Sequence, residues 1–217
     1  MNSCSQPPDT PKGRDSSYQS ARGIPLWVRW ASILWLIVWF PVYLHAWGAM
    51  NFLHLCDIAV ILTCAGLFLG NSLLLSSQAV SSLVIDLIWS LDVAWRLFLG
   101  RHLVGGTEYL FDAHVALGVR LLSLFHIALP VILLWALFRT GYDHRGFALQ
   151  SAIALGAIVA SRWAGAAGNI NYAFRDPFFH RAWGSAPAHV AITFAALAAV
   201  VYWPTHLALE KLFPPAN

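Results

Sequence analysis

Several ionisable side chains lie inside long apolar stretches of this 217-residue sequence. An ionisable group that faces hydrocarbon costs at least about 2.5 kcal/mol, so such residues turn inward, pair with one another and often mark a functional site. The residues of this kind are His54, Asp57, Asp86, Asp92, Arg120 and His126. They are therefore the first candidates for catalysis, ligand binding or proton transfer.

The segment His54-Leu-Cys-Asp57 places a thiol beside two titratable groups. Residues three apart share a helix face, so His54 and Asp57 are expected to hydrogen-bond. Cys56 is rotated away from that face, and a base for its thiol would come from another helix. Two plainer interpretations stay open: the His54–Asp57 pair satisfies itself inside the protein, and Cys56, like Cys64, packs as a small inert hydrophobe.

The two aspartates of the next apolar stretch have different expected partners. Asp92 lies four residues before Arg96, which predicts an i,i+4 ion pair near a membrane surface. Asp86 has only Ser, Leu and Trp three and four residues away, so its partner must lie on another helix. Arg120 is the natural charge complement, and a buried Asp86–Arg120 pair would hold two helices in register.

His126 lies in the middle of an apolar stretch, four residues before Pro130. A proline inside a helix removes one backbone hydrogen bond and kinks the helix. The carbonyl freed near position 126 could bond the imidazole or open a cavity beside it. His126 is thus a candidate catalytic group, with a hydrogen bond between helices as the structural alternative.

The composition indicates what must position these groups. Hydrophobic residues make up 59% of the chain and charged residues only 11%, against about 25% charged in a soluble domain. The 11 Trp residues suit the bilayer interface. Basic residues are scattered and the net charge is +3, which argues against nucleic acid as a partner and leaves membrane lipids. We expect an all-α polytopic membrane protein.

About six apolar segments approach the 20 residues that a spanning helix needs. Residues 1–23 are rich in Ser, Pro and charge and are expected to form a disordered tail, followed by a single bundle over residues 24–210. A tight turn at Gly70-Asn71 and a short interfacial helix within residues 101–112 are also expected. A slight excess of basic residues weakly favours a cytoplasmic N-terminus, and the oligomeric state stays undetermined. The predicted spans are 26–47, 51–69, 73–95, 117–138, 147–163 and 187–207.

Most familiar catalytic motifs are missing from the sequence. It has no Gly-x-Ser-x-Gly elbow, no His-Glu-x-x-His and no phosphate-binding glycine loop. Zinc held by His54, Asp57 and His126 is chemically reasonable, but their spacing matches no strong ligand pattern. We therefore predict no metal and no cofactor.

The stretch Asn51-Phe-Leu-His-Leu-Cys-Asp57 resembles the second-helix motif of the YwaF-like bacterial integral membrane proteins. That family is related to a eukaryotic acyltransferase of ether phospholipids and, more distantly, to androgen-induced-protein hydrolases of fatty-acid esters. Its later intramembrane His and its Asn-Tyr motif would correspond to His126 and Asn171-Tyr172. The Ala-Phe-Arg-Asp-Pro that follows Tyr172 matches the family only in part. The stretches Gly141-Tyr-Asp-His-Arg-Gly146 and Asn169-Ile-Asn-Tyr172 also look like a poorly characterised set of bacterial membrane proteins, which informs the fold more than the function.

The resemblance implies lipid acyl transfer or ester hydrolysis in a bacterial inner membrane. Cys56 would be the nucleophile and His126 its base, with His54 and Asp57 orienting the site. Arg120 or Arg175 would meet a lipid phosphate, and Asn171 would support the site.

Two other functions remain open. Asp57, Asp86, Arg120 and His126 could line a proton or solute path in a transporter or channel. Alternatively, the polar groups could only fix helix packing in a scaffold protein. A lipid-accessible cavity beside Cys56 would favour the enzyme, a continuous polar path would favour transport, and complete pairing would favour the scaffold.

Overall fold

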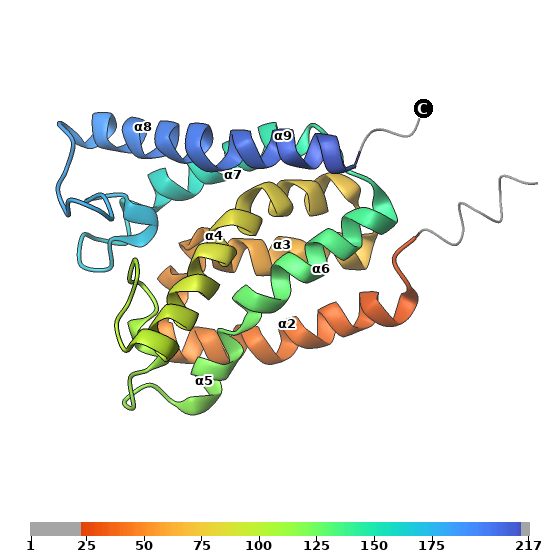
Figure 1. Ribbon diagram of the computed structural model, residues 1–217, viewed down its shortest axis with the longest axis horizontal. Helices are drawn as coiled ribbons and strands as arrows, with labels where there is room; N and C mark the ends of the chain where they lie inside the picture. Colours follow the sequence, from red (N-terminus) through yellow and green to blue (C-terminus); the bar gives the residue numbers. More distant parts are fainter. Residues whose placement is uncertain (1–22, 214–217) are drawn as a thin grey trace, which may run out of the picture.

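The computed structural model of the chain describes residues 23–213, which form helices joined by turns and loops (Figure 1). No strand occurs in that range, so the predicted all-α fold is confirmed for the described residues. The predicted disordered tail lies outside them except for Gly23. The helices are α2 (Leu26–Trp47), α3 (Leu55–Leu69), α4 (Ser72–Leu99), α5 (Leu117–Leu122), α6 (Phe125–Thr140), α7 (Gly146–Ser161), α8 (Ala186–Leu197) and α9 (Trp203–Leu212), with short segments η1 (Ala49–Leu53), η2 (Glu108–Leu110), η3 (Ile170–Tyr172) and η4 (Ala198–Tyr202).

Among residues 23–213, four helical stretches are long and apolar enough to cross a membrane. They are α2, α4, the combined stretch Leu117–Thr140 and the combined stretch Ala186–Leu212. Helices α3 and α7 are apolar but have only 15 and 16 residues, fewer than the roughly 20 that span a bilayer. The six predicted segments are therefore all helical, and four of them have the length of a membrane span.

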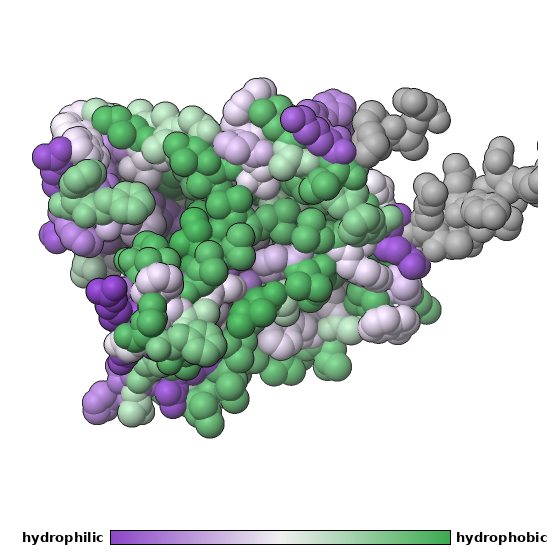
Figure 2. All heavy atoms as spheres, viewed as in Figure 1, coloured by the Kyte–Doolittle hydropathy of each residue, from purple (hydrophilic) through white to green (hydrophobic). Residues whose placement is uncertain are grey.

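The surface is apolar between two more polar ends. Figure 1 shows the helices running between two groups of loops, one of which contains the connections after α4 and α7. On the face in Figure 2, hydrophobic residues cover the middle and hydrophilic residues gather toward the ends. This distribution suits a protein whose middle faces lipid.

Helix α4 forms the centre of the bundle and packs against α3, α6 and α7. Small polar residues let α7 approach closely: a Cβ atom at Gly146 would lie 2.8 Å from Ser76 Cβ. Gln150 of α7 donates to Ser81 of α4 at 2.9 Å and to the Tyr202 hydroxyl at 3.1 Å. Small residues and hydrogen bonds between helices are the usual means of packing helices where lipid removes the hydrophobic contribution.

The predicted turn between α3 and α4 is confirmed. Gly70 has φ 65° and ends α3 in the left-handed conformation that glycine adopts most readily. Asn71 then caps α4 by accepting a hydrogen bond from Leu74 N at 3.0 Å.

Two helical stretches that contain a proline are irregular near it, and of the two prolines only Pro130 was predicted to disturb its helix. Helix α6 continues through Pro130, and the interruption falls earlier, at Ser123–Leu124. There His126 N bonds Ser123 O at 3.3 Å, a three-residue spacing that marks a tightened turn. Before Pro204, the π-helical segment η4 widens the helix, which accommodates a proline ring that would clash with the preceding turn.

Candidate functional site

The clearest polar contact in the interior joins Asp86 of α4 to His126 of α6. The distance from His126 Nδ1 to Asp86 Oδ1 is 2.7 Å, and the two residues are 6% and 1% exposed. Tight packing of α4 against α6 brings these residues, 40 positions apart, together. Since Nδ1 faces the carboxyl group, the other ring nitrogen, Nε2, is left for a reaction partner.

Aromatic rings fix the plane of the His126 imidazole. Trp89 stacks on it with centroids 4.6 Å apart, and Phe125 stacks at 4.2 Å. Within residues 23–213, no hydrogen bond reaches Nε2, and the buried Asp86 Oδ2 atom also has no partner. The pair is therefore held in place but only partly satisfied.

Cys56 lies in the first turn of α3, near this pair. Its sulfur is 4.0 Å from Asp57 Oδ1, and both Asp57 and Asp86 lie near enough to act on it electrostatically. His126 bonds Asp86 directly, whereas Cys56 lies within electrostatic range of Asp86 and shares no hydrogen bond with His126 in the described part of the chain. The structure thus places the Cys56 thiol of α3 within electrostatic range of the carboxyl group that bonds His126.

The predicted side-chain bond between His54 and Asp57 is wrong. Asp57 Oδ2 instead accepts a hydrogen bond from Asn51 Nδ2 at 2.5 Å. The reason is that α3 begins at Leu55, so His54 precedes the helix and its side chain does not share the helical face. His54 contributes its carbonyl, which accepts from Asp57 N at 3.1 Å.

Arg120 does not pair with Asp86. Its Nη1 donates to Leu110 O at 3.4 Å, and its buried Nε has no partner among the described residues. Arg120 belongs to α5, which the break at Ser123–Leu124 separates from α6, so its side chain serves the adjoining loop while His126 takes the carboxyl group. Arg175 is exposed in the loop after η3.

Asn171 holds the start of α3 in place. It has φ 51°, a left-handed conformation that Asn tolerates better than most residues. Its amide oxygen accepts from Leu55 N at 3.0 Å, and its amide nitrogen donates to Leu53 O at 2.6 Å and Ser161 Oγ at 3.0 Å. Asn171 therefore positions the turn that carries Cys56, in keeping with the supporting place predicted for it.

Three residues near the pair were not predicted from the sequence. The Tyr43 hydroxyl lies 2.6 Å from Ser123 Oγ, next to the broken turn before His126. Tyr109 of η2 lies near Ser123, Trp89 and Cys56, and burial raises its pKa to about 12, so its phenol stays protonated. No local pattern marks these residues, because a Tyr in an apolar helix or a loop is ordinary.

The function of this region has to be inferred from its own residues, because comparison with known proteins gives no relative. No family model, curated protein or solved structure matches the chain. The resemblance to YwaF-like proteins stays a prediction. In residues 23–213, no group of three or more His, Cys, Asp or Glu side chains is placed to hold a metal ion.

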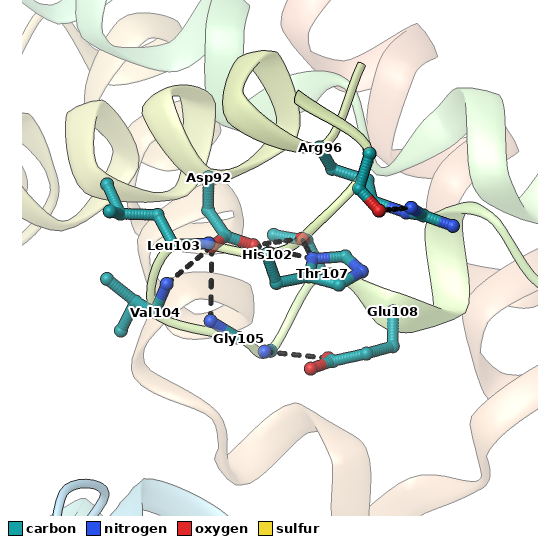
Figure 3. Close-up of polar contacts among 10 residues, drawn as sticks. Asp92, Arg96, His102, Leu103, Val104, Gly105, Thr107 and Glu108 are labelled. Atoms are coloured by element: carbon teal, nitrogen blue, oxygen red, sulfur yellow. Dashed lines mark hydrogen bonds and ion pairs between the residues drawn. The ribbon is translucent and has the colours of Figure 1, made fainter. Parts of the chain in front are cut away.

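A second Asp–His pair lies at the end of α4 (Figure 3). Asp92 Oδ1 accepts hydrogen bonds from the backbone N–H groups of Leu103, Val104 and Gly105 at 2.6, 2.6 and 3.1 Å. Asp92 Oδ2 meets the Thr107 hydroxyl and His102 Nδ1, the latter at 3.0 Å.

The predicted Asp92–Arg96 ion pair is wrong. Arg96 turns to the Gly100 carbonyl and lies over the Phe111 ring, with its guanidinium carbon 5.6 Å from the ring centroid. Both carboxylate oxygens of Asp92 already accept hydrogen bonds from the loop, so the buried group is satisfied without Arg96. The short helix expected in this loop is the single turn η2.

Proposed function

We propose that the six apolar helical segments form a bilayer-embedded bundle and that Cys56, with the Asp86–His126 pair as its base, transfers or hydrolyses a lipid acyl ester. The observation that carries the proposal is the buried 2.7 Å contact between Asp86 and His126. A nucleophile, a base and a third group that orients the base are the parts of nucleophilic acyl-transfer catalysis.

The hydrogen bonding assigns a role to each nitrogen of His126. With Nδ1–H donating to Asp86, the imidazole presents the lone pair of Nε2 as a base. Asp86 then stabilises the imidazolium that forms when Nε2 takes a proton. A carboxyl–imidazole pair that is held by Trp89 and Phe125 meets the requirement for a preorganised base.

The reaction proceeds in two steps. His126 Nε2 takes the thiol proton while the Cys56 sulfur attacks the ester carbonyl carbon; the carbon–oxygen bond breaks, and the lysolipid alkoxide leaves with the proton from His126. The second step is attack on the thioester by water or by the hydroxyl of another lysolipid, with His126 again as base, which releases the thiol. The bond between Cys56 and Nε2 would form as substrate enters, since catalytic hydrogen bonds commonly tighten only in the complex.

Two neighbouring groups suit the charges that develop. The protonated phenol of Tyr109 is a hydrogen-bond donor for the oxyanion of the tetrahedral intermediate. Arg120, whose Nε has no partner in the described residues, retains donors for a lipid phosphate. Arg175, on the exposed loop, is the other candidate for that phosphate contact.

The test is intact-mass measurement of the purified full chain after incubation with mixed phospholipids. We expect a fatty-acyl increment that hydroxylamine releases and that Cys56→Ser abolishes. Cys64→Ser is the matched control, because Cys64 is a second buried thiol on α3; its increment should persist. Rapid turnover would hide the thioester, so release of free fatty acid is followed in parallel. An increment that persists in Cys56→Ser, or neither product from the wild type, contradicts the proposal.

Proton transfer is the second candidate, and the number of buried polar residues on α4 favours it. Ser76, Gln78, Ser81 and Asp86 are all buried on this helix, on several of its faces, and Ser76 Oγ accepts a hydrogen bond from Asp143 N in the loop at one end. Polar and ionisable groups inside a membrane serve proton relays in pumps and transporters.

A flux assay separates the two candidates. Vesicles containing the full chain and a pH-sensitive dye would show proton flux that Asp86→Asn abolishes and Cys56→Ser leaves unchanged if α4 conducts protons. Absence of flux together with acylation of Cys56 supports the enzyme. Absence of both supports a packing role for the polar residues.

A further inference from the structure

A groove opens on the outside of the bundle between α2 and the segment at residues 114–119. Its volume is about 720 Å³, within the range of about 300–1,000 Å³ that small-molecule sites occupy. Its lining includes the apolar Val42, Gly118 and Val119, and the polar or aromatic His45, Trp47 and His114. The groove is therefore apolar along its walls and carries two imidazoles.

The surroundings of the groove are apolar and exposed. Leu44, Leu117 and Leu121 are 42%, 61% and 55% exposed. Trp47, which ends α2, is the residue type that prefers the bilayer interface. A smaller hollow of about 330 Å³, lined by Ile33, Ile37 and Phe40 among others, lies on another side of α2, toward Ile61 of α3, and Pro41 lines both. Within the groove itself, residues 41–47 of α2 cover roughly 9 Å of helix.

We propose that this groove binds an acyl chain of a membrane phospholipid, with His45 and His114 at the level of its headgroup. Imidazole N–H groups donate hydrogen bonds to phosphate or ester oxygens, while Val42 and Val119 contact the chain. The proposal rests on the placement of the bundle in a bilayer but not on catalysis by Cys56.

The lipid is preferred over other occupants because of where the groove opens. The neighbouring Leu44, Leu117 and Leu121 are exposed, and α2 is one of four helical stretches among residues 23–213 with the length and composition of a membrane span. A groove beside such a helix opens to lipid along its apolar side, while His45 and His114 in its lining suit the headgroup, so a lipid fits it without a partner protein.

The groove also adjoins the candidate catalytic region. Val119 O accepts a hydrogen bond from Ser123 Oγ at 3.1 Å, and Ser123 lies against Tyr43 in the turn before His126. A chain in the groove would thus lie against the wall that separates it from the Asp86–His126 pair.

The test uses the purified full chain in phosphatidylcholine vesicles that contain a phospholipid with a diazirine in one acyl chain. After illumination, peptide mass mapping should place adducts within residues 41–47 and 114–119, which line the groove. Gly118→Trp should lower labelling of these peptides about tenfold, because a Cβ at Gly118 meets no atom within 4 Å and a large side chain would fill the groove. Ala46→Trp, on the opposite wall, is a second plug in case Gly118→Trp fails to fold.

Gly156→Trp is the matched control. Gly156 is also an exposed helical glycine with nothing within 4 Å of a Cβ, but it lies on α7, outside the groove. Labelling should be unchanged in this variant and in Cys56→Ser, which separates lipid binding from catalysis. Uniform labelling of all exposed apolar helices, unaltered by Gly118→Trp and Ala46→Trp, would overturn the groove; no labelling of any helix would overturn the membrane placement itself.

Discussion

Two Asp–His pairs on α4 differ in how completely their hydrogen bonds are satisfied. Asp92 accepts from three backbone N–H groups, a hydroxyl and His102, all within one loop. Asp86, six residues earlier and equally buried, bonds only His126, and its Oδ2 has no partner in the described residues. The first carboxyl group therefore organises a loop, whereas the second retains capacity for a proton or a substrate.

The difference arises from position along the helix. Asp92 lies near the end of α4, where the chain turns back and supplies its own backbone donors. Asp86 lies deeper, where other helices supply only side chains, and their backbone N–H groups are already used. A buried carboxyl group that is left incomplete is the better indicator of a reactive site.

The largest expected effect is on the loop. Asp92→Ala should lower the free energy of unfolding by about 4 kcal/mol, because it leaves several loop donors without an acceptor. Asp86→Ala should cost about 2 kcal/mol, since it removes one bond. Unfolding in detergent micelles, followed by Trp fluorescence, measures both. Equal losses in Asp92→Ala and Asp86→Ala would contradict the contrast between the two pairs. Asp92→Asn keeps one acceptor oxygen, so its loss of unfolding free energy should lie between zero and that of Asp92→Ala.

The next effect concerns catalysis. Asp86→Asn should slow acylation of Cys56 about 100-fold, or about 2.7 kcal/mol, because an amide no longer favours the tautomer with a free Nε2 lone pair. The free energy of unfolding should change by less than about 1 kcal/mol. Rapid-quench mass spectrometry gives the rate. If acylation proceeds at the wild-type rate, Asp86 does not orient the base.

A smaller change in unfolding free energy should distinguish a buried hydroxyl that makes a hydrogen bond from one that makes none. Thr107→Val removes a buried hydroxyl that bonds Asp92 and should cost about 1–2 kcal/mol of unfolding free energy. Thr63→Val is the control: its hydroxyl is buried on α3 and has no partner among residues 23–213, so the change should be neutral or stabilising. A loss at Thr63 equal to that at Thr107 would argue against this account of the loop.

The smallest effect belongs to Asp143, a partly buried carboxyl group in the loop between α6 and α7. Hydrogen bonds from Arg145 lower the pKa of Asp143 below its ordinary value of 3.8. A depressed pKa in the folded state stabilises the protein above pH 3.8, and that contribution is lost as the pH falls through the folded-state pKa. Asp143→Asn should therefore lower the Tm slightly at pH 6, and this difference should shrink below pH 3.8. If the Tm difference between the wild type and Asp143→Asn instead grew as the pH fell, the pKa of Asp143 would be raised in the folded state and not lowered.

Part of the candidate site was predictable from single positions. Ionisable residues in apolar stretches are costly, so Asp86 and His126 could be singled out before their arrangement was known. Cys56 became a candidate only through the family resemblance, since a thiol in an apolar helix otherwise packs as a small hydrophobe. Asn171 could be named only through a resemblance, and its left-handed turn supplies the reason for its position. The contribution of Tyr109 could not be predicted, because it depends on where a loop folds back.

The predicted partners failed for a common reason. Helical spacing predicted that His54 bonds Asp57, but the helix begins at Leu55, and Asn51 bonds the carboxyl group instead. Charge complementarity predicted that Arg120 pairs with Asp86, but α5 and α6 are separate helices, and His126 of α6 bonds the carboxyl group. A one-residue change in where a helix starts, or a break of one turn, redirects a side chain toward a different neighbour.

The sequence by itself determined the all-α architecture and the places of the apolar helices, because long apolar segments satisfy their own backbone hydrogen bonds most readily as helices. It also determined which residues would be costly to bury. Only the tertiary structure decided that Asp86 meets His126, that Asp92 binds a loop and that a groove opens beside α2. Periodicity fixes the faces within one helix, whereas packing against other helices decides which faces meet.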